Sequence, residues 1–374
     1  MSWEMVKLIE ICRPKQWKTL SMGSLAKSGY PVYGANGKIG YYNRYTHEFP
    51  TLMVTCRGAT CGSVNISEPK SYINGNAMAF DNLSGDFDRQ FLYYFFLQRG
   101  FNDVISGSAQ PQITGQGLSK ILVPKAAPEI QKRISSILNK ADALRKKDQR
   151  LLLKYDQLLE SVFYHMFGDP MQNKNGWISC ELKTLFNSNP RIGTIKPVSE
   201  FGSIPIVRVG ELGELDINIE KCKKVSLPPK EKERYLLKKN DILLARAIGS
   251  INHLGKASLV RGVDNEIVFD SHVMRLQFNQ GKLNSLFFYN WLQSSGGRNI
   301  FLSNSGKTSV QFNINSEQIS RIKINLPPTE LQNHFASIAE NIQQQRKKIK
   351  QQIELSQSLF QSLLQKAFKG ELVN

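Results

Sequence analysis

An internal repeat constrains the fold of this 374-residue chain more than any other feature of its sequence. Glu129-Ile130-Gln131 returns 201 residues later as Glu330-Leu331-Gln332. Without a gap, the same offset pairs Arg145-Lys146-Lys147 with Arg346-Lys347-Lys348, and the match continues to Phe167. One register held over such a span indicates a duplication, so the chain is expected to contain two copies of one structural unit.

The segments upstream of these matches also correspond, although with insertions. The corresponding pairs are Trp3 and Trp177, Tyr30-Pro31-Val32 and Ile204-Pro205-Ile206, the run from Leu52 to Arg57 and the run from Ile242 to Arg246, and Asn76-Ala77-Met78 and His272-Val273-Met274. The order along the chain is therefore domain, helix, diverged domain, similar helix.

Each long helix is predicted to begin just after a proline, at Pro128 and at Pro327-Pro328, because proline disfavours helix in the residue before it. Apolar residues then recur every seven positions, which favours coiled-coil packing. In the first helix the rows are Ile130, Ile137, Leu144, Leu151 and Leu158, with companions Ile134, Ala141, Tyr155 and Val162; in the second they are Phe335, Ile342 and Ile349, with Ile338 and Leu359. Polar residues dilute the second seam at Gln345, Gln352 and Ser356. We expect an antiparallel pair within the chain; an intermolecular coiled coil is the alternative.

The predicted fold is α+β, with two mixed domains alternating with two long helices in a pseudo-two-fold duplication. The boundaries are 1–128 and 170–328 for the domains, and 129–169 and 329–374 for the helices. Short apolar runs at 51–55 and 241–245 predict strands. Aromatic-rich runs at 91–98 and 286–293 predict short helices against a sheet.

Charge indicates the kind of partner. Lys and Arg number 49 against 31 Asp and Glu, a net charge of +18, which favours nucleic acid and, as a weaker alternative, an anionic membrane surface. No apolar run reaches the roughly 18 residues of a membrane helix, and the N-terminus lacks a secretory pattern. The five cysteines fit reduced thiols in the cytoplasm, because the spacing of Cys56 and Cys61 is no zinc pattern.

The sequence contains no persuasive catalytic constellation, and neither a metal site nor a cofactor is expected in the chain. Gly306-Lys307-Thr308 resembles the end of a phosphate-binding loop, but Phe301 occupies the position of an essential glycine. The nearest strings to an adenine methyltransferase motif are Asn189-Pro190-Arg191 and Asn325-Leu326-Pro327-Pro328, and neither fits. The five histidines form no recognisable set with a nucleophile and an orienting acid.

Candidate DNA-binding residues lie in polar, glycine-rich loops, where amides and cations can read base edges or hold phosphates. In the first domain they are Tyr33, Asn36, Lys38, Tyr41, Arg57, Ser108, Gln110 and Gln112. In the second they are Arg208, Arg246, Ser250, Asn252, His253, Lys307, Thr308 and Gln311. Gln112 and Gln311 are predicted adenine readers. Solvated turns and structural ion pairs remain open as alternatives for these loops, and a solvated helix face remains open for the Arg-Lys-Lys triplets.

This layout resembles the specificity subunit of type I restriction-modification systems over essentially the whole chain. The stretch from Gly107 to Gln112, continuing through Leu118-Ser119-Lys120-Ile121 into Glu129-Ile130-Gln131, carries the resemblance together with its repeat from Ile319 to Gln332. Tyr33-Gly34-Ala35-Asn36-Gly37 and Leu243-Leu244-Ala245-Arg246 also look like parts of that family's target-recognition domains.

The resemblance implies a non-catalytic DNA-binding subunit that reads a bipartite, asymmetric site on double-stranded DNA, one target-recognition domain per half-site. The helices would act as a spacer and dock two methyltransferase subunits, which methylate adenine N6 with S-adenosylmethionine after flipping the base. Restriction and translocase subunits would complete the complex, away from any membrane. Two alternatives stay open: the recognition subunit of a type II-like restriction–methylation enzyme, and a basic coiled-coil scaffold.

Overall fold

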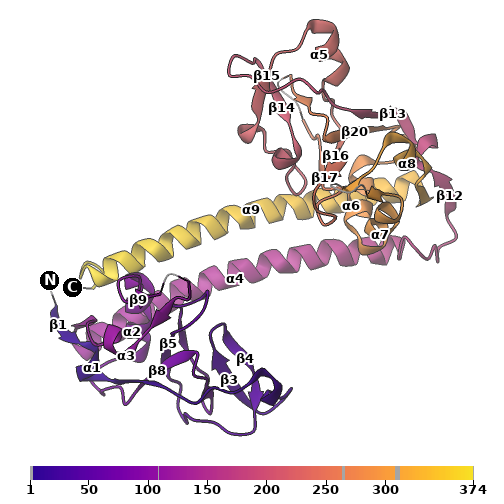
Figure 1. The fold of residues 1–374 in the computed structure, drawn as a ribbon. Helices are drawn as coiled ribbons and strands as arrows, with labels where there is room; N and C mark the ends of the chain where they lie inside the picture. Colours follow the sequence, from indigo (N-terminus) through magenta and orange to yellow (C-terminus); the bar gives the residue numbers. More distant parts are fainter. Residues whose placement is uncertain (1–2, 108, 263–265, 308–311, 374) are drawn as a thin grey trace. The chain divides into compact units, whose positions relative to one another are not determined.

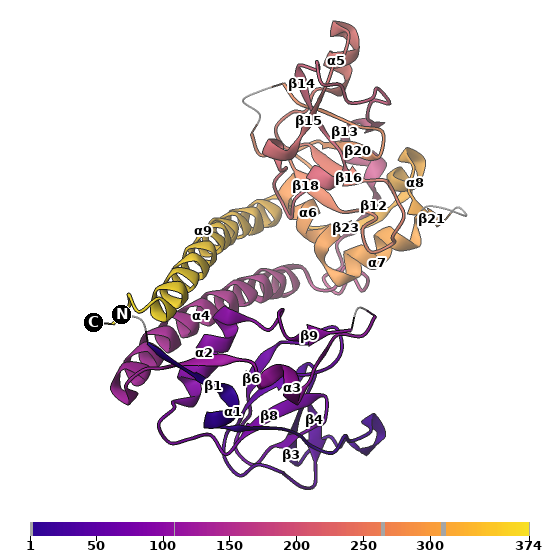
Figure 2. The same cartoon turned by 60° about the vertical axis from the view of Figure 1, so that its left-hand side comes forward.

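The computed structural model of the chain describes residues 3–107, 109–262, 266–307 and 312–373 (Figures 1 and 2). The chain divides into two compact units. Unit 1 comprises Met1–Arg150 and Lys350–Asn374, and unit 2 comprises Leu151–Ile349. The two long helices, α4 (Pro128–Phe167) and α9 (Thr329–Phe368), each contribute one half to each unit.

The domain of unit 1 is built mainly from short strands. In chain order its elements are β1 (Glu4–Lys7), α1 (Leu8–Ile11), β2 (Arg13–Gln16), η1 (Met22–Ser24), β3 (Tyr30–Gly34), β4 (Gly37–Tyr42), β5 (Leu52–Thr55), β6 (Val64–Ile66), β7 (Tyr72–Ile73), β8 (Ala77–Asp81), α2 (Arg89–Arg99), β9 (Ile105–Ser106), β10 (Gln112–Ile113), α3 (Gly115–Leu118) and β11 (Leu122–Lys125). A four-stranded sheet has the order β2-β8-β5-β6, and a three-stranded sheet has the order β4-β3-β7.

The domain of unit 2 repeats this plan with additions. Its elements are β12 (Ile178–Glu181), η2 (Leu182–Thr184), β13 (Phe186–Ile192), β14 (Ile204–Val207), η3 (Val209–Glu211), η4 (Ile219–Lys221), β15 (Lys223–Val225), α5 (Pro229–Tyr235), β16 (Ile242–Ala245), β17 (Ala247–Ile248), β18 (Ala257–Leu259), β19 (Val268–Phe269), β20 (Val273–Phe278), α6 (Ser285–Gln293), α7 (Ser295–Ser303), β21 (Gly306–Lys307), β22 (Phe312–Asn313), α8 (Ser316–Arg321) and β23 (Lys323–Leu326). The sheet orders β13-β20-β16-β18 and β15-β14-β19 match those of unit 1 strand for strand.

The expected α+β duplication is therefore confirmed, as are the predicted strands and aromatic-rich helices. The predicted strands at 51–55 and 241–245 are β5 and β16, and the predicted helices at 91–98 and 286–293 are α2 and α6. The sequence between Asn187 and Lys196 has no clear match in the first domain, but most of this segment lies in β13. β13 pairs with β20 as β2 pairs with β8, and register shifts that interrupt the β13 pairing hide the correspondence.

The first strand of each domain pairs with the last strand, which leads into the long helix. β1 pairs with β11 in unit 1, and β12 pairs with β23 in unit 2, both antiparallel. The residue after each first strand repeats one further contact: Leu8 N–H donates to Ile121 O, and Leu182 N–H donates to Ile322 O, both at 2.9 Å. These matching contacts place the first strand of each domain beside the start of a long helix.

A buried glutamine fastens each long helix to its domain. Gln131 is fully buried; its side-chain oxygen accepts from Asp88 N at 2.7 Å, and its nitrogen donates to the carbonyls of Asp86 and Ala126. Asp88 is also the N-cap of α2, since its side chain accepts from Phe91 N. One side-chain amide thereby joins the first turn of α4 to the first turn of α2.

Gln332 makes the same three bonds in unit 2. It is fully buried, accepts from Asn284 N at 2.9 Å, and donates to the carbonyls of Lys282 and Pro327. Asn284 is the N-cap of α6. The repeated glutamine therefore has one structural role in both copies.

Within each unit, the halves of α4 and α9 pack in antiparallel register. In unit 1, Arg145 donates to Gln357 Oε1 at 3.1 Å. In unit 2, Arg346 lies 2.6 Å from Asp156, and the rings of Phe167 and Phe335 are 5.2 Å apart. The helix halves share one hydrophobic core with the domain in each unit.

The buried seam differs from the predicted rows of sevens. Leu144 and Leu158 are 40% and 46% exposed, and Leu359 is 48% exposed. Gln345 and Gln352 are exposed as well, so of the three predicted polar seam residues only Ser356 is buried.

In unit 1 the seam of α4 runs through Ile134, Leu138 and Ala141 and continues through Arg145 and the buried Asp148. Two of these seam positions are charged. A prediction from apolar residues alone therefore misses them and assigns part of the seam to a neighbouring row of the helix. Among the described residues, no helix has the length and apolarity needed to cross a membrane.

We predict that Gln131→Ala and Gln332→Ala each lower the free energy of unfolding by roughly 2–4 kcal/mol, because each leaves buried backbone groups without their partner. Chemical denaturation of the full chain measures the change. Gln345→Ala, at an exposed position of α9, is the matched control and is expected to change stability by less than about 0.5 kcal/mol. Equal effects of the buried and exposed substitutions would contradict the anchoring role.

Candidate nucleic-acid interface

Three loops of the first domain converge on one another. They are the turn between β3 and β4, the loop of residues 56–63 after β5, and the loop between β9 and β10. The hydroxyls of Thr55 and Thr60 donate to Ala35 O at 2.9 and 2.8 Å, which joins the first loop to the second. Gly58 N–H donates to Pro111 O at 3.3 Å, which joins the second loop to the third.

This convergence brings several predicted site residues into one loop cluster. Asn36 lies in the β3–β4 turn, and its Oδ1 is 3.2 Å from Thr60 Oγ1. Arg57 forms an antiparallel bridge with Gln112, the first residue of β10, and Gln110 lies two residues earlier in the third loop. Asn36, Arg57, Gln110 and Gln112 are all exposed. The cluster thus presents amides and a guanidinium to solvent, the groups that bond base edges and phosphates.

Tyr33, Lys38 and Tyr41 have other surroundings. Tyr33 is buried in β3 and its hydroxyl lies 3.3 Å from Glu68 Oε1, so it belongs to the core rather than to the exposed surface. Lys38 Nζ is 3.2 Å from the same oxygen and 4.8 Å from the ring centroid of Tyr41. The hydrogen bond to Glu68 raises the pKa of Lys38.

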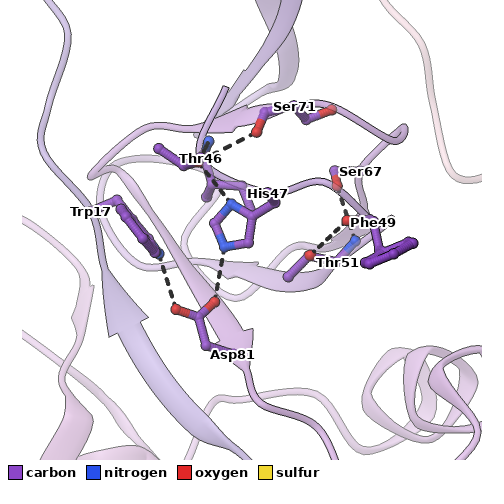
Figure 3. Close-up of polar contacts among 9 residues, drawn as sticks. Trp17, Thr46, His47, Phe49, Thr51, Ser67, Ser71 and Asp81 are labelled. Atoms are coloured by element: carbon purple, nitrogen blue, oxygen red, sulfur yellow. Dashed lines mark hydrogen bonds and ion pairs between the residues drawn. The ribbon is translucent and has the colours of Figure 1, made fainter. Parts of the chain in front are cut away.

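A cluster around His47 supports the first domain (Figure 3). His47 Nε2 is 2.9 Å from Asp81 Oδ1, while Thr46 Oγ1 is 2.7 Å from His47 Nδ1. Trp17 Nε1 donates to the other Asp81 oxygen, and the Thr46 hydroxyl accepts from Ile73 N. The Thr46 hydroxyl and the Asp81 carboxylate are both engaged in these bonds. They therefore hold the loop that precedes β5 against β7, through Ile73, and against β8, through Asp81.

In the second domain, the predicted arginines are partly occupied by structural contacts. Arg208 lies 2.7 Å from buried Glu211, whose other oxygen accepts from Arg208 N. Burial alone would raise the pKa of Glu211, but the hydrogen bonds from Arg208 hold it below its usual range. Arg246 donates to Ser271 O at 2.9 Å. Both arginines are partly exposed as residues.

The sequence comparison, which aligns the run ending at Arg57 with the run ending at Arg246, is wrong by one residue at these two arginines. Cys56 N–H bonds Asn76 O and Cys56 O accepts from Ile113 N, whereas Arg246 N–H bonds His272 O and Arg246 O accepts from Ile314 N. Arg246 therefore occupies the position of Cys56. Since successive residues of a strand point to opposite faces, the two arginines leave the sheet in different directions.

The remaining predicted residues of this domain lie in two loops. Ser250, Asn252 and His253 belong to the loop before β18; Ser250 O accepts from His253 N, and Asn252 O accepts from Arg298. The backbone of Lys307 belongs to β21. Ser108, Thr308 and Gln311 lie outside the described residues.

Sequence reasoning missed two residues of these loops. Thr60 is the bridge between the first two loops of the first domain. Asn313 is the counterpart of Gln112, because each directly precedes the isoleucine that bonds the end of β5 or β16. The 201-residue offset already pairs Gln112 with Asn313, so the signal for Asn313 was present in the repeat. In the part of the chain that the structure describes, no cluster of His, Cys, Asp and Glu could hold a metal ion.

Comparison with known proteins gives the family. Residues 1–153 and 174–355 match the type I restriction modification DNA specificity domain. The chain is 26% identical over 330 residues to the type I restriction enzyme StySPI specificity subunit of Salmonella potsdam, a match that covers 84% of this chain and 68% of that protein. It is 22% identical over 339 residues to a putative type I restriction enzyme specificity subunit, S.HindORF215P, of Haemophilus influenzae, with coverages of 86% and 82%.

The fold is similar to the crystal structure of a type I restriction-modification system S subunit from M. genitalium. The TM-score is 0.67 at 16% sequence identity, and the match covers 98% of this chain and 96% of that one. Two matched segments, each ending within a long helix, agree with the duplication described above. The chain therefore belongs to the family of type I restriction modification DNA specificity domains, and it carries two of them.

Proposed function

We propose that this chain reads a bipartite, asymmetric DNA site for a type I restriction-modification complex, with residues 1–128 reading one half-site and residues 170–328 the other. DNA sequence recognition within a type I complex is the function that the family match and the relatives support. The chain's net charge of +18 suits the phosphate backbone.

The observation that carries this proposal is the pair of matched but chemically different loop clusters. Gln112 and Asn313 occupy equivalent strand positions, while Arg57 and Arg246 occupy different ones. Two copies of one scaffold that place arginine at different positions beside an equivalent amide offer DNA different sets of groups, so the two half-sites are expected to differ.

The chain itself acts without catalysis in this proposal. Two methyltransferase subunits supply adenine methylation, and restriction and translocase subunits supply cleavage. α4 and α9 act as the spacer between half-sites. Chromosomal DNA is the substrate, which makes the cytoplasm the compartment that this function requires.

Exposed leucines on the long helices support two equivalent docking places. Leu158 in unit 2 and Leu359 in unit 1 are related by the 201-residue offset and are 46% and 48% exposed. Leu144, Leu153 and Leu355 are also exposed on these helices. Large apolar side chains in matched exposed positions of two copies fit one partner surface used twice.

The first test is genome-wide mapping of methylated adenine in the source strain, with and without this chain. We expect deletion to remove methylation at one split, asymmetric motif and to leave other motifs unchanged. An unchanged methylome in a strain that expresses the complex would contradict the specificity role. A lost motif that is continuous rather than split would favour a type II-like enzyme.

We predict that Gln112→Ala and Asn313→Ala weaken binding through opposite half-sites. Each is expected to cost about 1–3 kcal/mol, because a bidentate amide–adenine contact is lost. Fluorescence anisotropy with duplexes altered in one half-site at a time measures the effect, and Gln98→Ala, an exposed glutamine at the end of α2, is the control. An equal loss on every sequence would instead assign these residues to phosphate contact or to structure.

Leu158→Gln and Leu359→Gln are each expected to remove one methyltransferase subunit from the assembly. Glutamine keeps the helix but replaces the apolar contact, so affinity for one partner should fall at least tenfold while circular dichroism is unchanged. Native mass spectrometry of the reconstituted complex counts the subunits. Leu97→Gln, at a 42% exposed position of α2, is the control. Full assembly of both variants would exclude these leucines as docking residues.

A further inference from the structure

The two copies differ where the domain helix packs against the long helices. In unit 1, Tyr94 of α2 and Phe360 of α9 are both buried, with ring centroids 6.1 Å apart. The Tyr94 hydroxyl donates to Asn139 at 2.8 Å. Two large aromatic side chains thus fill this part of unit 1.

Smaller side chains occupy the equivalent positions of unit 2. The N-caps Asp88 and Asn284 align α2 with α6, so Tyr94 corresponds to Asn290; the 201-residue offset relates Phe360 to Leu159. Asn290 and Leu159 both line a cavity of about 730 Å³. Its walls come from α4, α6, α7, α9, the Gly213-Glu214 segment and the loop that precedes β18, all within unit 2.

Two cationic side chains of the cavity wall have no ion-pair partner among the described residues, while the wall as a whole carries three cations, Arg298, Lys256 and Arg346, and three carboxylates, Asp156, Glu160 and Glu214. Arg346 is paired with Asp156 and Glu214, at 2.6 and 3.1 Å. Arg298 and Lys256 also line the cavity, and neither forms an ion pair with a carboxylate of the described residues.

Arg298 is held in place by backbone groups instead. Its Nη2 donates to Ile251 O at 3.1 Å and to Asn252 O at 3.3 Å. Burial lowers the pKa of this guanidinium, and no acidic group offsets that effect. A half-buried guanidinium oriented by carbonyls retains donors for an anion, because arginine has five N–H groups in a fixed fork.

Neutral polar groups also line the cavity. Tyr289, Asn290 and Ser294 are nearly buried, with 5–7% of each residue exposed, and all three lie on the cavity wall. Small-molecule sites are concave, measure roughly 300–1,000 Å³ and combine an apolar body with a few placed polar groups. The carboxylate of Glu160 also lines the cavity but lies on an exposed residue.

We propose that this cavity of unit 2 binds a small anionic molecule, of a size up to a nucleotide, whose phosphate or carboxylate group is held by Arg298 and Lys256. Binding at this site would be a function separate from DNA recognition, and the proposal does not depend on which bases the loops read. The two copies differ here because unit 1 has two aromatic rings at the matched positions where unit 2 has Asn290 and Leu159.

The experiment uses the purified full-length chain and three probes: inorganic pyrophosphate, adenosine monophosphate and citrate. Calorimetric titration and thermal unfolding measure binding. We expect at least one probe to bind and to raise the unfolding temperature by several degrees. Pyrophosphate and adenosine monophosphate without citrate would identify a phosphate ligand; citrate alone would identify a carboxylate.

Two variants test the location. Arg298→Gln is expected to weaken probe binding at least tenfold, whereas Arg234→Gln, at an exposed arginine of α5, should leave it unchanged. The double variant Leu159→Phe with Asn290→Tyr restores the packing of unit 1 and should abolish binding without lowering the unfolding temperature. Binding that survives in both variants would overturn the assignment.

Failure of all three probes to bind the unaltered chain would also overturn the proposal. If Arg298→Gln then weakened assembly with the methyltransferase subunits, the cavity would instead receive an acidic protein segment. Specific DNA binding by the same preparations, measured in parallel, keeps this outcome separate from a failure of sequence recognition.

Discussion

The buried amides of Gln131 and Gln332 are the interactions on which both units depend. Each amide uses its oxygen and its nitrogen on backbone groups at the start of α2 or α6 and at the end of the preceding strand. A buried amide that lost these partners would cost far more than an exposed one, so the helix and the domain can pack in only one way. This requirement explains why the glutamine recurs in the strongest match of the repeat, although its surroundings have diverged.

A second constraint lies in the seam between the helix halves. Arg145 and Arg346 occupy equivalent positions, and each bonds one residue three positions earlier on its own helix and one residue across the seam: Asp142 and Gln357 in unit 1, Gln343 and Asp156 in unit 2. A shift of register would bury a guanidinium without its partner, which is costly, whereas leucines alone tolerate slippage. Polar seam residues therefore specify the antiparallel register in each unit.

These same residues show what the sequence could and could not predict. Helix limits, the duplicated order and the strands β5 and β16 were predictable, because proline punctuation and apolar periodicity are local signals. The true seam was not, because Arg145 and Asp148 interrupt its apolar pattern. The burial of Tyr33 and the one-residue difference between Arg57 and Arg246 depend on strand register, which long-range pairing sets.

The candidate interface also explains how recognition can change while the fold is kept. In the first domain the hydroxyls of Thr55 and Thr60 join two of its loops, but the other links are between backbone groups: Gly58 N to Pro111 O in that domain, and Ile314 N to Arg246 O in the second. Such bonds do not depend on which side chains the loops carry. Under the proposed function, substitutions at Gln112 or Asn313 therefore alter the side chains offered to DNA while these backbone bonds stay in place, so two copies of one scaffold can acquire different sequence preferences independently.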